Sequence, residues 1–144
     1  MKKIFIINGP NLNMLGTREP EIYGHLSLAD IEVMCREKAN EYGYEVDFRQ
    51  SNHEGEIIEW IQNARERVDA VVINAAGYTH SSVAIHDALK LLECPVIEVH
   101  LSNPKEREAF RHVSLIEPVA SAVFAGHGAE SYTMAIEKLS EVFG

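Results

Sequence analysis

The six residues KIFIIN, at Lys3–Asn8, decide the fold class that this sequence predicts. They include four apolar residues in a row, three of them β-branched isoleucines. A continuous apolar run of this length is typical of a strand that is buried on both faces. Two further runs, DAVVINAA at 69–76 and PVIEVHL at 95–101, have the same character. Strands buried on both faces belong to parallel sheets that lie between two layers of helices.

Amphipathic stretches alternate with the apolar runs along the chain. We predict further strands at 45–50 and 119–126, and helices at 27–43, 54–67, 81–92 and 130–143. The first helix begins with a capping pattern, because Ser27 is followed by Asp30 three residues later. The helix at 81–92 is expected to bury Ala84 together with Ile85, Ala88 and Leu89. The alternation predicts an α/β fold of the flavodoxin-like, doubly wound type.

The predicted sheet has five parallel strands in the order 2-1-3-4-5, with helices on both faces, in a single domain over residues 1–144. A net charge of −9, from 13 basic and 22 acidic residues, argues against a nucleic-acid or anionic-membrane binder. The two cysteines lack zinc-site spacing, and no metal or cofactor motif occurs. The apolar run after Met1 is shorter than a signal peptide or a membrane helix requires, so we expect a cytoplasmic protein without a membrane segment.

Polar side chains follow the strands at their predicted carboxyl ends, where ligands bind in such sheets. They are Asn8 and Asn11 after the first strand, Asn74 and His80 after the third, and Glu98, His100, Ser102, Arg111 and His112 in and after the fourth. Asn8 and Asn74 also admit a simpler interpretation, in which they satisfy backbone groups where the strands end. If the following helix begins near His80, then His80 and Asp87 lie on a similar face, although a lone aspartate is more often a solvated helix residue.

Glu98 and His100 are two residues apart on a strand, so we expect both side chains on the same face. A charged pair inside a buried strand is costly unless it is functional or well paired. A carboxylate beside an imidazole would hold the ring in one orientation, which suits a general acid. A satisfied ion pair at the strand end is the alternative.

The loop at about 9–26 is longer than most connections in compact domains, and such loops are usually functional or disordered. It carries Arg18 and Tyr23 between Gly16 and Gly24. Glycines at both ends can act as hinges of a lid. A neighbouring guanidinium favours the phenolate form of a tyrosine, so Arg18 and Tyr23 together could abstract a proton.

Four blocks, INGPNLNMLGTREPEIYG, NAAGYTHSSVAIHDAL, EVHLSN and FRHVS, resemble the type II 3-dehydroquinate dehydratases. The resemblance implies a flavodoxin-like enzyme of the shikimate pathway, which leads to aromatic amino acids. Such an enzyme converts 3-dehydroquinate to 3-dehydroshikimate and uses neither a metal nor a Schiff base. The competing hypotheses are a non-catalytic flavodoxin-like module that binds a small ligand, and a structural subunit whose polar residues only satisfy strand ends.

The resemblance also implies a role for each motif residue. Tyr23 is the base, Arg18 keeps it ionised, and a water held near Asn11 stabilises the enolate. His100, oriented by Glu98, protonates the departing hydroxyl.

The implied substrate contacts come from Asn74, His80 and Arg111 to hydroxyls, and from the Leu101–Ser102 backbone and the Ser102 side chain to the carboxylate. Asp87 is expected to reach the site from a neighbouring subunit. The implied assembly is a dodecamer built from trimers.

Overall fold

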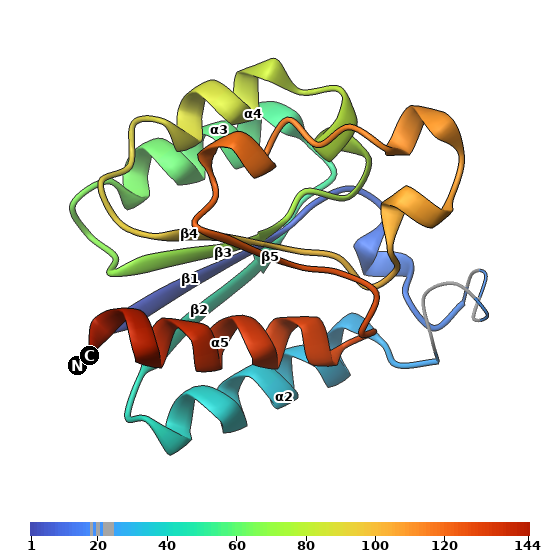
Figure 1. Ribbon diagram of the computed structural model, residues 1–144. Coiled ribbons are helices and arrows are strands. Elements are labelled where there is room, and N and C mark those ends of the chain that lie inside the picture. The colour runs from blue at the N-terminus through green and yellow to red at the C-terminus, as the bar shows by residue number, and fades with distance from the viewer. Residues whose placement is uncertain (18, 20, 22–24) are drawn as a thin grey trace.

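The computed structural model describes residues 1–17, 19, 21 and 25–144. Its centre is one sheet of five strands in the order β2-β1-β3-β4-β5 (Figure 1). The strands are β1 (Lys3–Asn8), β2 (Glu45–Gln50), β3 (Ala70–Asn74), β4 (Val96–Val99) and β5 (Ala122–Phe124). Every neighbouring pair is parallel. The predicted sheet type and strand order are confirmed.

Helices cover both faces of the sheet, as predicted. Figure 1 shows α2 (Leu28–Glu41) and α5 (Glu130–Phe143) on one face, and α3 (Glu54–Ala64) with α4 (Val83–Leu89) on the other. Alternate residues of β1 supply both hydrophobic cores, because successive side chains of a strand point to opposite faces. Ile4 and Ile6 belong to the core under α2 and α5, whereas Phe5 and Ile7 belong to the core under α3 and α4.

The start of α2 has the capping box that the sequence predicted. The Asp30 backbone N–H donates to Ser27 Oγ (3.1 Å), and the Ser27 backbone N–H donates to Asp30 Oδ2 (2.9 Å). These bonds satisfy two of the backbone donors that a helix leaves unpaired at its start. The helix then buries Ile31, Cys35 and Ala39, which fixes its face toward the sheet.

The segment before α4 differs from the prediction. A 3-10 turn at Ala76–His80 precedes the helix, and Ser82 caps it by accepting the Ile85 N–H at 2.9 Å. His80 is therefore not part of the helix, and the expected shared face of His80 and Asp87 is wrong. The prediction that Ala84 is buried is also wrong, since Ala84 is exposed. With only seven residues, α4 buries one narrow stripe, which Ile85, Ala88 and Leu89 fill.

The last strand is shorter than predicted. It covers only Ala122–Phe124, because Glu117–Val119 forms a 3-10 turn and three residues of β4 pair with the strand. The strand forms the outer edge of the sheet, and its Val123 is 40% exposed. Within the part of the chain that is described, no helix has the length and apolar character needed to cross a bilayer.

Candidate active site

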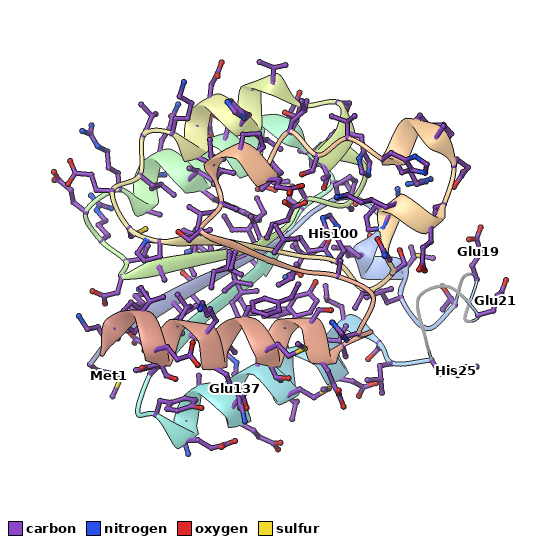
Figure 2. The ribbon with its side chains drawn as sticks, in the orientation of Figure 1. Met1, Glu19, Glu21, His25, His100 and Glu137 are labelled. Atoms are coloured by element: carbon purple, nitrogen blue, oxygen red, sulfur yellow. The ribbon has the colours of Figure 1, made fainter. Side chains whose placement is uncertain are left out.

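A cavity of about 160 Å³ lies at the carboxyl edge of the sheet. Its lining includes Asn11, Asn74, His80, His100, Leu101, Ser102, Arg107 and Arg111. Figure 2 shows His100 on the side of the molecule where the connecting loops gather. The structure therefore brings together most of the predicted site residues, from strands that are far apart in the sequence. It does not bring in Asp87, which is exposed on α4 and is absent from this lining.

Glu98 and His100 form a buried pair at the end of β4. Glu98 is 1% exposed and His100 is 7% exposed. The two side chains share a face, as the strand periodicity predicted, and His100 Nε2 contacts Glu98 Oε2. Glu98 lies between Ile73 of β3 and Val123 of β5 in the strand register, so the sheet fixes the backbone from which the carboxylate extends. The pair can hold the imidazole at the cavity wall in one orientation.

Ser114 adds a third side chain to the Glu98–His100 pair, and sequence reasoning missed it. Its hydroxyl donates to Glu98 Oε2 at 2.8 Å. Ser114 lies 16 residues after Glu98, in a segment without helical or strand periodicity. Its position in the FRHVS block was the only sequence signal that could have singled it out.

A second buried network joins β1, β3 and α5. The Tyr132 hydroxyl donates to Asn8 Oδ1 at 2.7 Å and accepts a hydrogen bond from Asn74 Nδ2 at 3.0 Å. Asn8 Nδ2 donates to the Arg49 carbonyl at 3.0 Å, and the Ala76 N–H donates to Asn74 Oδ1 at 3.1 Å. The simpler interpretation therefore holds for Asn8. Asn74 both satisfies the backbone and lines the cavity.

Tyr132, which sequence reasoning also missed, is 0% exposed. Burial raises the pKa of the Tyr132 phenol well above its usual range, and the hydrogen bond from Asn74 offsets this only in part. The phenol is therefore neutral and serves as a fixed hydrogen-bonding group. It holds the two asparagine side chains in one orientation each.

The turn after β1 shapes the other wall of the cavity. Gly9 approaches β3 so closely that a Cβ atom there would lie 2.4 Å from the Ala75 carbonyl oxygen, so only glycine fits. Asn11 has a positive φ of 69°, a region that asparagine tolerates better than most residues. The Asn11 N–H donates to Asn52 Oδ1 (2.9 Å), which also accepts from Gln50 Nε2 (3.1 Å). These contacts hold Asn11 at the rim.

The predicted lid region of 9–26 begins with an anchored segment. Residues Leu12–Met14 form a 3-10 turn, and Leu12 and Leu15 are each 5% exposed. These leucines pack into the core beneath α2 and α5. Arg18 and Tyr23 lie outside the described residues, so the predicted lid pair stays a prediction.

Cationic side chains lie along the opposite rim. Arg111 Nε donates to Glu108 Oε1 at 3.0 Å, which holds the guanidinium beside the cavity. This contact with Arg111 and the hydrogen bond at its own backbone lower the pKa of the exposed Glu108 carboxyl. Arg107, which we did not single out from the sequence, also lines the cavity and donates to Ser102 Oγ at 3.4 Å. The cavity is therefore flanked by two guanidinium groups in a protein of net charge −9.

The chain turns sharply after β4. The Gly126 N–H donates to the Ser102 carbonyl (3.2 Å), and the Gly128 N–H donates to the Leu101 carbonyl (3.0 Å). Within the described part of the chain, the N–H groups of Leu101 and Ser102 donate no backbone hydrogen bond. An anion in the cavity could accept them. His80 donates from Nδ1 to the Val113 carbonyl at 2.8 Å, which fixes its ring at the same edge.

The described residues contain no cluster of three or more His, Cys, Asp or Glu side chains that could hold a metal ion. A buried imidazole, guanidinium groups and amide side chains around one cavity can transfer a proton and hold a polyhydroxylated anion.

Comparison with known proteins gives one consistent result. Residues 2–140 match the family model described as Dehydroquinase class II. A 3-dehydroquinate dehydratase of Phenylobacterium zucineum is 57% identical over 136 residues, which cover 94% of each chain. A protein of the same name from Rhizobium meliloti is 52% identical and covers 96% of this chain and 94% of its own. The crystal structure of a type II dehydroquinase from Butyrivibrio crossotus superposes with a TM-score of 0.94 at 48% identity, covering 96% of this chain and 97% of that chain.

Proposed function

Because this chain belongs to the class II dehydroquinase family, we propose that its carboxyl-edge cavity is where it dehydrates 3-dehydroquinate to 3-dehydroshikimate, a step of the shikimate pathway. The chain is an enzyme of the hydro-lyase class, and the comparisons give no support to a non-catalytic binding module. The single observation that carries the assignment to this cavity is His100 in its wall, which the buried Glu98 carboxylate contacts.

In the proposed reaction a proton leaves the carbon next to the ketone, and a hydroxyl leaves the adjoining carbon as water. His100 supplies the proton to that hydroxyl, and the buried Glu98 carboxylate holds the ring in place. Charge inside a water-poor site is stabilised most strongly by groups that are already fixed in place. Burial and the hydrogen bonds around Glu98 support this role for the pair.

The groups that remove the proton and stabilise the enolate are assigned to the turn after β1 and the loop that follows it. We infer that Tyr23 removes the proton, that Arg18 keeps it ionised, and that a water near Asn11 stabilises the enolate oxygen. The position of Asn11 in the cavity lining supports the last of these roles. Arg18 and Tyr23 lie outside the described residues, and their roles rest on the family motif and on the effect of a guanidinium on a neighbouring phenol.

The remaining cavity residues are assigned to substrate binding. The hydroxyls are held by Asn74, His80 and Arg111, and the carboxylate is received by the Leu101–Ser102 backbone and the Ser102 hydroxyl. Arg107 adds positive charge beside Ser102, which favours an anionic group there. Polar contacts of this number suit a substrate that carries several hydroxyls and a carboxylate.

We further propose that the protein acts in the cytoplasm as a dodecamer of trimers, and that Asp87 completes a neighbouring subunit's site. The exposure of Asp87 and its absence from the cavity of its own subunit support this arrangement. Sedimentation gives the assembly size. Asp87→Ala should reduce turnover in the assembled protein, and a fully active monomer would contradict the proposal.

The test of the function is ultraviolet absorbance after 3-dehydroquinate is added to the purified protein, since the conjugated product absorbs where the substrate does not. We expect the absorbance to rise equally after treatment with a metal chelator and after borohydride reduction in the presence of substrate. Loss of turnover with the chelator would reveal a metal requirement, and loss with borohydride would reveal an imine intermediate. Either result would contradict the proposed chemistry.

A further inference from the structure

The hydroxyl of Ser114 has a fixed direction of donation. A serine hydroxyl carries one hydrogen and two lone pairs. The backbone N–H groups of Ile116 and Glu117 both donate to Ser114 Oγ, at 3.1 and 3.0 Å. Both lone pairs are therefore in use, and the single hydrogen must point to the remaining neighbour, Glu98 Oε2, at 2.8 Å.

This direction determines which atom carries the proton between Glu98 and His100. Glu98 Oε2 already accepts the Ser114 hydrogen, so it faces His100 Nε2 as an acceptor as well. A protonated Oε2 would be a carboxylic-acid hydroxyl oxygen, which is a much weaker acceptor for the Ser114 hydrogen than an ionised carboxylate oxygen. The proton of the pair therefore belongs to His100 Nε2.

Among the described residues, only Ser114 and His100 form hydrogen bonds with the Glu98 carboxylate. Glu98 Oε1 is buried without a hydrogen-bond partner in the described part of the chain. A second cavity, of about 340 Å³, is lined by Glu98, His100 and Ser114 and by further titratable side chains, namely His80, Lys105, Arg111, His112, Glu117 and His127. Among the described residues, none of them forms a hydrogen bond with Glu98 or His100. The orientation of the carboxylate thus depends on Ser114 and on the ring itself.

We propose that Ser114 is a positioning residue, which fixes the Nε2–H tautomer of His100 and so makes Nδ1 the atom that delivers the proton to the substrate. This inference rests on the proposed role of His100 as general acid. In the elimination, the imidazolium gives its Nδ1 proton to the departing hydroxyl, and water leaves. The ring is then neutral with its proton on Nε2, and it regains the Nδ1 proton from solvent.

The first test measures the tautomer directly. The ring nitrogens of the seven histidines are observed by NMR in protein labelled with ¹⁵N-histidine, and the His100 signals are assigned as those that disappear in His100→Gln. When the ring is neutral, we expect a protonated Nε2 and an unprotonated Nδ1. A neutral ring with its proton on Nδ1 would overturn the proposal without any variant of Ser114.

The second test uses variants of Ser114. Ser114→Ala should give a mixture of His100 tautomers and a kcat lower by about tenfold or more, approaching the loss expected when a general acid fails. KM should change by less than about twofold, because Ser114 is not part of the lining of the 160 Å³ cavity to which substrate binding is assigned. Ser114→Thr, which keeps the hydroxyl, should restore both readouts. The matched control is Ser140→Ala, whose hydroxyl bonds only to the Glu137 carbonyl within α5.

Two results separate this inference from the proposed function. A folded Ser114→Ala protein with the wild-type tautomer and kcat would overturn the role of Ser114. Normal turnover in His100→Gln would instead remove the general-acid role, whichever tautomer the wild type shows. If Ser114→Ala does not fold, Glu98→Gln replaces it. Ser114 should still turn the amide oxygen toward His100 and keep the Nε2–H tautomer, and an Nδ1–H ring in that variant would contradict the proposal.

Discussion

Two polar triads lie at the carboxyl ends of neighbouring strands, and they differ in charge. The amide–phenol triad of Asn8, Tyr132 and Asn74 joins β1, β3 and α5, and all its groups are neutral. The carboxylate–imidazole triad of Glu98, His100 and Ser114 lies at the end of β4 and contains two ionisable groups.

The two triads serve different purposes in one fold: the first stabilises the folded state, and the second serves the reaction. In the amide–phenol triad, the hydrogen bonds join buried groups that would be unsatisfied without them, so these bonds stabilise the folded state. In the carboxylate–imidazole triad one carboxylate oxygen is left without a partner among the described residues, and the ring faces the cavity. We therefore expect changes in the first triad to lower stability, and changes in the second to lower turnover.

The largest expected effect is on turnover. Glu98→Gln keeps the size of the side chain and removes its charge, so the His100 ring loses its ionic partner. We expect kcat to fall by about 10²-fold, within the range that general acid catalysis contributes. Steady-state kinetics and thermal melting measure the two effects, with the exposed Glu59→Gln on α3 as the control. A Glu98→Gln protein that loses stability but keeps its kcat would show that this triad supports the fold and not the reaction.

The next effect is on stability. Tyr132→Phe keeps the buried ring but leaves Asn8 Oδ1 without its donor and Asn74 Nδ2 without its acceptor. The free energy of unfolding should fall by about 2 kcal/mol, the usual cost of unsatisfied buried groups. KM should rise, since the Asn74 amide is no longer held, while kcat changes little. Denaturant unfolding checks this against Tyr42→Phe, whose ring is 40% exposed. Equal stability of the two variants would count against a structural triad.

The same tyrosine predicts an alkaline effect. Burial raises the pKa of Tyr132 above its ordinary value, so the folded protein keeps a proton that the unfolded chain releases. Its contribution is complete below a pH of about 10 and is lost as the pH rises further. Unfolding measured at several alkaline pH values should show a shallower decline for Tyr132→Phe than for the wild type. Parallel declines would show that this phenol is not shielded.

The smallest expected effect comes from a residue outside both triads, and it serves as the reference for a loss of stability without a loss of turnover. Ser27→Ala removes the capping box of α2 and should cost about 1 kcal/mol of stability, the usual value for such a cap. We expect kcat to stay unchanged, since Ser27 contacts neither triad. Unfolding and turnover are measured on the same preparation. A kcat loss as large as that of Glu98→Gln would mean that turnover follows general stability.

Much of the fold could be predicted because its signals are local. The strand at Lys3–Asn8, the strand at Glu45–Gln50 and the helix at Glu130–Phe143 begin and end where the sequence predicts. Hydrophobic periodicity and capping residues act over a few neighbours, so one sequence suffices to see them. The region after β4 was harder, since it consists of 3-10 turns such as Pro104–Glu106 and Ala109–Arg111 that have no periodicity.

The candidate site was predictable only in part, because only some of its residues are placed by local sequence patterns. Glu98 and His100 are two residues apart on a strand, so their shared face follows from strand geometry. Ser114 and Tyr132 reach the same edge through tertiary contacts across 16 and 124 residues, which no local pattern encodes. The Arg18–Tyr23 pair was inferred from its place in a long loop and from the family motif, and both residues lie outside the described part of the chain.

The most direct test of the account is the kcat of His100→Ala with 3-dehydroquinate, followed by product absorbance and paired with a melting curve. We predict a loss of about 10²- to 10⁴-fold with a melting temperature close to that of the wild type, because this ring delivers a proton and does not support the core. A folded His100→Ala protein that dehydrates the substrate at the wild-type rate would contradict the account.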